Sequence, residues 1–318
     1  MPPGVQQGVR DARGELKYSA ATVVENRAES ADGSLRTLVL SVEDQVTFLE
    51  GRTMRRRQEA PRWVDAYMVP GQFVAVCHEG GAAAQRLYAL ANSPYAARRD
   101  SANLAASIIE VLVDRSGCAD DRQLAQLGPG ALLDVSNVIG RGYASLFNSY
   151  VGLLSALEDS RNLLMIGAGA SGIAPLRSAL EWAPVQAHAT AHRVALFYAA
   201  LDASRAGYIK DWDVWRGAGV RVEPCYLSAD AAAAGVGAAG DGSPRNGAFA
   251  GPEPQAILAA LEEAIFDGNG GLHGAVGGDP HNAAVLISGL PGDATAALTR
   301  RLTSEGIKGE RILFCEFS

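Results

Sequence analysis

The stretch that decides the fold lies near the middle of the chain and reads Met165-Ile166-Gly167-Ala168-Gly169-Ala170-Ser171-Gly172-Ile173-Ala174-Pro175. An apolar run leads straight into three glycines and then into a helix that we expect to open at Ser171. Glycines let the backbone turn sharply and approach a phosphate, and the free N–H groups of a helix start face the anion. The sequence therefore predicts a pyrophosphate cradle. Its expected members are Gly167, Gly169, Ser171, Gly172 and Pro175, with the proline in the first helical turn, where a missing N–H costs little.

The second half of the chain alternates between strand and helix patterns. Strands are expected at residues 163–166, 194–199, 220–226, 284–288 and 312–317, and helices at 171–183, 204–216, 253–266 and 294–305. This alternation predicts a parallel sheet with crossover helices.

The half that precedes the cradle reads as β-structure. Six strand candidates, at residues 16–24, 34–42, 71–77, 86–91, 107–113 and 131–138, suit a small antiparallel barrel. A short helix with an acidic start is expected at 120–126, between the last two strands. The predicted fold class is thus a two-domain β plus α/β protein. We expect a tail at 1–14, a barrel domain at 15–158 and an α/β domain at 159–318.

Composition limits the classes of function. The chain has 318 residues, 48% of them apolar, a mean hydropathy of +0.03 and no apolar run of 18 residues, so no membrane span is expected. A net charge of −7 argues against a nucleic-acid partner. The four cysteines lie far apart, which indicates neither a metal site nor a disulfide framework and favours a reducing compartment. The first 14 residues lack the apolar core of a secretory signal.

Two segments look like insertions. Residues 48–69 carry Arg52, Arg55, Arg56, Arg57 and Arg62, and we expect a surface loop there. This loop is either simply solvated or a docking place for an acidic electron-transfer partner. Residues 230–251 are rich in Ala, Gly and Ser, and a flexible loop is expected.

A second motif lies about 80 residues before the cradle and reads Arg86-Leu87-Tyr88-Ala89-Leu90-Ala91-Asn92-Ser93-Pro94. The two motifs in this order resemble the ferredoxin–NADP reductase superfamily. In that family a flavin barrel carrying Arg-x-Tyr-Ser precedes a nicotinamide-nucleotide domain that opens with Gly-x-Gly-x-x-x-x-Pro. The resemblance covers about residues 15–318 and looks closest to the plant and algal branch that includes the kiwi "fruit protein" reductase-like sequences. This branch implies a chloroplast location.

The resemblance implies FAD and NAD(P)H as cofactors. Arg86 and Tyr88, two apart on a strand, point to the same side. By resemblance Arg86 contacts the FAD pyrophosphate and Tyr88 stacks on the isoalloxazine ring. The other expected flavin contacts are Ala89, Leu90, Ala91, Asn92 and Ser93 around the ring, and Ser116 and Gly117 at the phosphates. Ala89 is a departure, because the family usually has a hydroxyl there to bind flavin N5.

For the nicotinamide nucleotide, the cradle residues would hold the pyrophosphate. Tyr208 falls where the family has a tyrosine near the adenine. Asp202 stands after the second strand, where a carboxylate would repel a 2′-phosphate, and this favours NADH. Ser288 and Gly289 replace the Cys-Gly that lies beside the nicotinamide in the family. The expected catalytic residues are Tyr88 and Ser288, and no metal site is expected.

The expected function is hydride transfer from NAD(P)H to FAD and passage of electrons to an unknown acceptor. Ala89, Leu201 and Ser288 depart from the family pattern, and they support an alternative. The chain could instead be a reductase-derived structural or regulatory subunit of a larger photosynthetic or respiratory complex.

Overall fold

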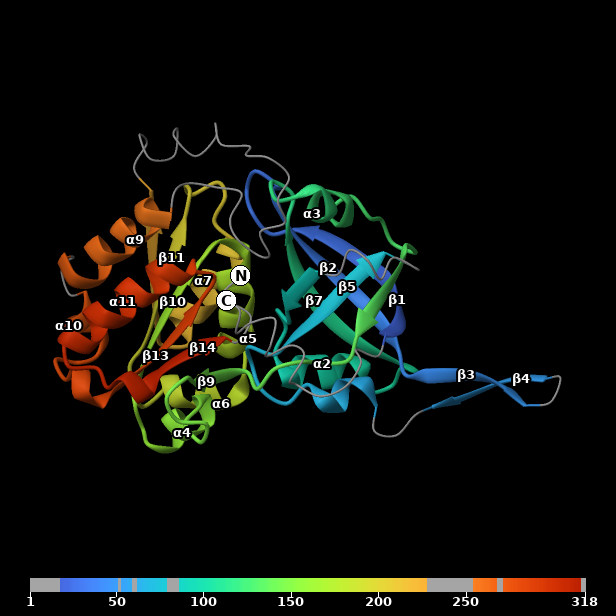
Figure 1. Ribbon diagram of the computed structural model, residues 1–318, viewed down its shortest axis with the longest axis horizontal. Coiled ribbons are helices and arrows are strands. Elements are labelled where there is room, and N and C mark those ends of the chain that lie inside the picture. The colour runs from blue at the N-terminus through green and yellow to red at the C-terminus, as the bar shows by residue number, and fades with distance from the viewer. Residues whose placement is uncertain are drawn as a thin grey trace.

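The computed structural model describes residues 18–50, 53–58, 62–78, 86–227, 254–267 and 271–315, with 45–50 and 53–58 described as backbone only. Within these ranges an antiparallel barrel lies beside a layered α/β unit (Figure 1). The expected tail at 1–14 and the loop expected at 230–251 lie outside the described residues. No helix in the described part of the chain is long and apolar enough to cross a membrane.

The first unit is a six-stranded antiparallel sheet that curls into a barrel, as predicted. Its strands are β1 (Tyr18–Ala28), β2 (Leu35–Glu43), β5 (Phe73–His78), β6 (Arg86–Ala89), β7 (Ala106–Asp114) and β8 (Leu132–Ser136), in the order β6-β5-β8-β1-β2-β7. The two edge strands approach each other where Leu90 bridges to Val111 and the Ala91 N–H donates to the Glu110 carbonyl at 2.8 Å. This closure brings the end of β6 against β7.

Shorter elements connect the strands of the barrel. A hairpin of β3 (Gln45–Glu50) and β4 (Thr53–Gln58) extends away from it (Figure 1) and is followed by a 3-10 turn, Trp63–Ala66. The stretch 48–69 therefore contains regular structure, which corrects the expectation of a plain surface loop. Helix α2 (Pro94–Ser101) follows β6, and α3 (Ala119–Leu124) lies between β7 and β8, close to the predicted helix at 120–126.

The second unit is built on a six-stranded sheet in the order β12-β11-β10-β13-β14-β9. Its strands are β9 (Tyr143–Ser145), β10 (Asn162–Ala168), β11 (Val194–Ala200), β12 (Val220–Tyr226), β13 (Ala283–Ser288) and β14 (Ile312–Cys315). All neighbours pair in parallel except β9, which pairs antiparallel with β14. The chain thus joins this sheet from Tyr143 on, which is earlier than the boundary expected near residue 159.

Helices cover both faces of this sheet. They are α4 (Leu153–Glu158), α5 (Gly169–Leu180), α6 (Ala183–Ala189), α7 (Ile209–Gly217), α9 (Pro254–Glu262), α10 (Leu272–Ala275) and α11 (Gly292–Ser304), and a π-helical turn, Glu263–Asp267, continues α9. The alternation of side chains along each strand sends apolar groups to both sides. Leu163 and Met165 of β10 pack under α5, α6 and α7, whereas Leu164 and Ile166 pack under α9, α10 and α11.

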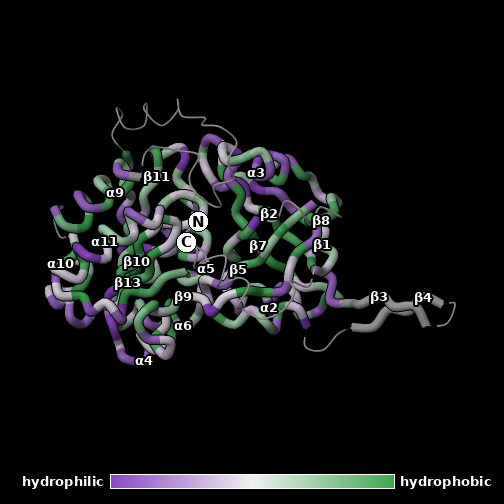
Figure 2. Tube along the Cα trace, viewed as in Figure 1, coloured by the Kyte–Doolittle hydropathy of each residue, from purple (hydrophilic) through white to green (hydrophobic). Residues whose placement is uncertain are grey.

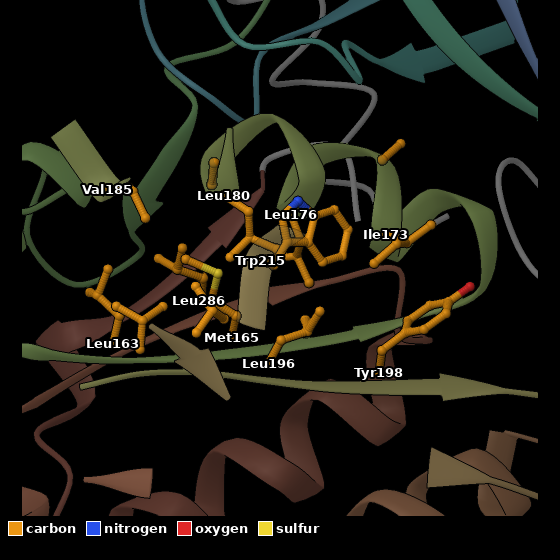
Figure 3. Packing of buried hydrophobic residues seen from close by; sticks show 14 of the residues in the cluster. Leu163, Met165, Ile173, Leu176, Leu180, Val185, Leu196, Tyr198, Trp215 and Leu286 are labelled. Carbon is orange, nitrogen blue, oxygen red and sulfur yellow. The ribbon is translucent and has the colours of Figure 1, made fainter. Parts of the chain in front are cut away.

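The packing on the α5 side joins helix and sheet closely. Figure 3 shows Ile173, Leu176 and Leu180 of α5 above Met165 and Leu196 of the sheet. Figure 2 shows β10 and β13 as mostly hydrophobic tracks at the centre of this unit. Burial on both faces explains why these strands read as continuous apolar runs in the sequence.

Arg177 of α5 connects the α/β unit to the barrel. Its Nη1 donates to Glu110 of β7 at 2.7 Å and to the Ala91 carbonyl at 3.2 Å. Its other nitrogens meet Asp211 and Glu181, both at 3.0 Å. Only 12% of the Arg177 side chain is exposed, so these charges lie in a largely buried seam between the two units.

Hydroxyl groups extend the same seam. Tyr208, in the left-handed region at φ 55°, lies fully buried under the Arg177 guanidinium at 4.6 Å. The Tyr208 hydroxyl meets Thr37 Oγ1 of β2 at 2.9 Å. The Tyr67 hydroxyl meets Ser178 Oγ of α5 at 2.6 Å. Contacts between residues more than 100 positions apart thus hold the two units together.

Glu181 makes the stability of this seam depend on pH. Burial raises its pKa from 4.5 to about 7, against the attraction of Arg177 and with repulsion from Asp211 and Glu110. The native state therefore binds the Glu181 proton more tightly than the unfolded chain does. The free energy of unfolding should fall by about 1 to 3 kcal/mol as pH rises from about 4.5 to about 7, and then level off.

Urea unfolding curves between pH 5 and 8 measure this dependence. Glu181→Gln should flatten the fall, because the titrating group is gone. Glu305→Gln is the matched control, since Glu305 pairs with Arg301 at the same i,i+4 spacing on the exposed side of α11. An unchanged slope in Glu181→Gln would contradict the assignment.

Candidate functional site

At the predicted cradle, three backbone segments touch: the end of β10, the start of α5 and the end of β13. A Cβ on Gly172 would lie 2.8 Å from the Ser288 carbonyl oxygen, and one on Gly289 would lie 2.3 Å from the Gly172 nitrogen. Gly289 also has φ +71°, which L side chains rarely adopt. Gly169 turns the chain from β10 into α5 with φ 58°. The glycines therefore let the end of β13 rest directly on the turn that begins α5.

Helix α5 begins two residues earlier than expected, at Gly169. Pro175 consequently lies inside the helix, which corrects its predicted place in the first turn. The N–H that Pro175 lacks would otherwise bond to the carbonyl of Ser171, one turn back. Gly169, Ala170 and Ser171 remain partly exposed at the start of the helix.

Ser288 braces the cradle from the side. Its hydroxyl donates to the Gly172 carbonyl at 2.9 Å and accepts from the Tyr143 hydroxyl at 3.1 Å. Ser288 is fully buried, and Tyr143 comes from β9, the antiparallel edge strand. The observed role of Ser288 is to tie β13 to the glycine turn, and the catalytic role expected for it stays a prediction.

A pocket opens where β10 and β11 end, between the cradle and the barrel. Its lining includes Asp114, Ser116, Gly169, Ala170, Leu201 and Arg205. Ligands of open α/β sheets bind outside the carboxyl ends of the strands, so the pocket lies where a nucleotide is expected. Barrel residues form the other wall of this pocket.

Charged groups next to this pocket are already paired. Asp202 Oδ1 accepts from the N–H groups of Ser204 and Arg205 at 2.7 and 3.2 Å, and from the Ser204 hydroxyl at 2.6 Å. The hydroxyl contact is the largest of the causes that lower the pKa of Asp202. The Arg205 side chain pairs with Asp32 of the barrel at 3.3 Å. Asp202 thus shapes the turn after β11. Tyr208, expected near the adenine, lies instead in the interdomain seam.

Arg86 and Tyr88 converge on one carboxylate. The Tyr88 hydroxyl donates to Asp121 Oδ1 at 2.5 Å, and Arg86 Nη2 lies 3.1 Å from Asp121 Oδ2. Arg86 Nη1 also lies 2.6 Å from Cys118 Sγ. Tyr88 is 7% exposed, and burial, followed by the charge of Asp121, raises its pKa well above the usual value. The two residues therefore share a face of β6, as predicted, and their polar groups contact Asp121 of α3.

The residues that follow Tyr88 are buried at the end of β6, some in the barrel core and some against the α/β unit. Ala89, Leu90 and Ala91 are buried in the two apolar cores. Asn92 bridges to β7, because its Oδ1 accepts from the Glu110 N–H at 3.1 Å. Ser93 caps α2 by accepting from the Ala96 N–H at 3.2 Å. In these contacts Asn92 and Ser93 stabilise the end of β6.

The turn after β7 is held by a second carboxylate. Asp114 Oδ1 accepts from the N–H and the hydroxyl of Ser116 at 2.8 and 2.6 Å. The Gly117 N–H donates to the Asp114 carbonyl at 2.9 Å. Burial raises the pKa of Asp114 above its usual value. Ser116 and Gly117, expected at the flavin phosphates, thus lie on a turn that contains its own anion.

Sequence reasoning missed three residues of this region: Asp114, Asp121 and Tyr143. The acidic start of the helix at 120–126 was a visible signal for Asp121. Tyr143 had no local signal, because its partner Ser288 lies 145 residues away.

No family model and no curated protein matches the chain. Solved structures do. The chain is similar to a cytochrome P450 reductase from Amycolatopsis at 18% identity and a TM-score of 0.59, over 96% of this chain and 71% of that one. It is similar to a ferredoxin NADP+ reductase from Neisseria gonorrhoeae with bound FAD and NADP at 16% identity and a TM-score of 0.56, over 94% and 98%.

A third similar structure is the H286L mutant of ferredoxin-NADP+ reductase from Plasmodium falciparum, with 8% identity, a TM-score of 0.57 and coverage of 93% and 94%. These three neighbours are a cytochrome P450 reductase and two ferredoxin–NADP+ reductases, and at such low identity their likeness concerns the fold alone. The chain thus has the fold of the ferredoxin–NADP reductases, with an antiparallel barrel followed by a parallel α/β unit.

Proposed function

We propose that this chain is a flavin-dependent oxidoreductase that takes hydride from NAD(P)H onto FAD and passes electrons to a further acceptor. The observation that carries the proposal is the convergence of Arg86 and Tyr88 on the single anion Asp121. Two donors on one strand face that already bind a carboxylate can bind a phosphate by the same charge-assisted contacts. The arrangement therefore suits a phosphate-bearing cofactor.

When bound, FAD supplies the redox chemistry, and the protein supplies placement and charge. Arg86 would neutralise the FAD pyrophosphate, and the ring of Tyr88 would lie against the flavin. In the pocket at the ends of β10 and β11, Gly169 and Ala170 would present the start of α5 to a nicotinamide nucleotide. Ser288 keeps the end of β13 in contact with this turn.

The neighbours support the proposal through what their own names state. The Neisseria gonorrhoeae structure contains FAD and NADP. The Amycolatopsis protein is a reductase of a cytochrome P450, and another similar structure is the ferredoxin reductase of a carbazole dioxygenase. We accordingly propose an electron-transfer protein as the acceptor. The arginines of the sequence at 52–57 favour an acidic one. Arg62, expected to belong to the same group, is instead paired with the buried Asp44 at 2.8 Å.

The alternative, a structural or regulatory subunit, keeps specific support. Ala89 offers no hydroxyl, and both hydrogen-bonding directions of the Ser288 hydroxyl are already used inside the protein. The similarity to the plant and algal branch and the chloroplast location stay predictions.

The visible absorption spectrum of the purified protein separates the two functions. We expect bound oxidised flavin, or its uptake after FAD is added, and loss of the flavin absorbance when NADH or NADPH is supplied without oxygen. Boiled protein with the same FAD is the control. A protein that takes up no FAD would favour the subunit instead.

NADH should reduce the flavin at least as well as NADPH. Near the pocket, Arg205 is already paired with Asp32, and Asp202 adds a negative charge. Asp32→Asn frees Arg205 and should shift the ratio of the two kcat/KM values toward NADPH by roughly 2- to 5-fold, the size of a partly exposed ion pair.

Steady-state rates with both donors measure this ratio. Asp159→Asn is the control. It removes the same charge just before β10, at the amino ends of the strands, whereas the pocket lies at their carboxyl ends. A strong NADPH preference in the unmodified protein would contradict the role given to these carboxylates.

A further inference from the structure

Asp121 uses both carboxylate oxygens on the two residues that the proposed function assigns to FAD. Oδ1 accepts from the Tyr88 hydroxyl at 2.5 Å, and Oδ2 lies 3.1 Å from Arg86 Nη2. Oδ2 also accepts from the Cys118 N–H at 3.3 Å. The Asp121 side chain is only 9% exposed. The contacts of this carboxylate are therefore those that a flavin phosphate would require.

The same carboxylate closes the turn beside it. A Cβ on Gly117 would lie 2.5 Å from Asp121 Oδ2. On the other side of this turn lies the buried carboxylate of Asp114, and the charge of Asp121 contributes to the raised pKa of Asp114. A pyrophosphate placed against Arg86 would thus meet two acidic groups, Asp121 and Asp114. Like charges in a buried place repel strongly, because water screens them little.

We propose that Asp121 is an intramolecular competitor of the FAD pyrophosphate and sets the affinity of this protein for flavin. Binding of FAD exchanges the Asp121 contact of Arg86 for a phosphate contact, and Asp121 moves toward solvent. Because one set of charge-assisted bonds replaces another, the net gain is small. FAD is then an exchangeable ligand rather than a permanently held group. This inference rests on the proposed function, and it concerns which residue controls occupancy.

Flavin titrations of the flavin-free protein test the competition directly. Quenching of flavin fluorescence gives Kd values for FAD, FMN and riboflavin with the wild type, Asp121→Asn and Asp121→Ser. Both variants remove the charge but keep a side-chain oxygen on α3. FAD and FMN should bind roughly 10- to 100-fold more tightly to the variants, the range of one charge-assisted contact. Riboflavin has no phosphate, so its Kd should stay the same.

Asp120→Asn is the matched control, because it removes an equal charge one residue away and should change the Kd of FAD less than 3-fold. The double variant Arg86→Ala, Asp121→Asn should not bind FAD more tightly than the wild type, since the phosphate then lacks its cation. Circular dichroism confirms the fold of each variant, and the two substitutions at position 121 guard against failure of one to fold.

The outcomes distinguish failure of the competition from failure of the proposed flavin function. If FAD binds the wild type, and Asp121→Asn and Asp121→Ser bind it equally or more weakly, the competition is overturned and the flavin function stands. A uniform tightening of FAD, FMN and riboflavin also overturns it, because the effect would not involve the phosphate. If none of the three flavins binds any form of the protein, the proposed function fails, and the competition fails with it.

Discussion

The rest of the structure depends on the approach of two backbones at Gly172 and Gly289. No side chain fits between them, so the end of β13 rests on the turn that starts α5. This contact fixes the direction in which α5 leaves the sheet. The direction of α5 in turn brings Arg177 to Glu110 of the barrel. One steric constraint inside the α/β unit therefore determines how the unit faces its neighbour.

Many strands and helices could be predicted because local sequence patterns determine them. Buried strands such as β10 and β11 are continuous apolar runs, and the short helix after β7 begins with acids and ends before a Gly-Pro pair. The sequence could not predict β9, since three residues form a strand only because β14 lies beside them. The hairpin of β3 and β4 was likewise hidden, because its arginines and polar residues are typical of a loop.

The candidate site, too, could be predicted from the sequence only in part. The spacing of Arg86 and Tyr88, two apart on one strand, predicted that they share a face, and they do. It could not predict the anion that they meet. An arginine in a motif indicates that it pairs with a negative group, whereas the identity of that group depends on distant residues. Tyr208 illustrates the point again, because Thr37, 171 residues away, fixes where its hydroxyl lies.

The buried seam around Arg177 also bears on how the molecule loses its structure. Arg177 is shielded from water only while the barrel and the α/β unit remain together. Melting either unit alone would break the contact between Arg177 and Glu110. It would also expose to water the apolar residues of both units that pack in one shared cluster, among them Leu112 of the barrel and Ile173 of α5. The exposure of this apolar surface opposes half-unfolded species. The two units thereby form one cooperative block, although each has its own apolar core.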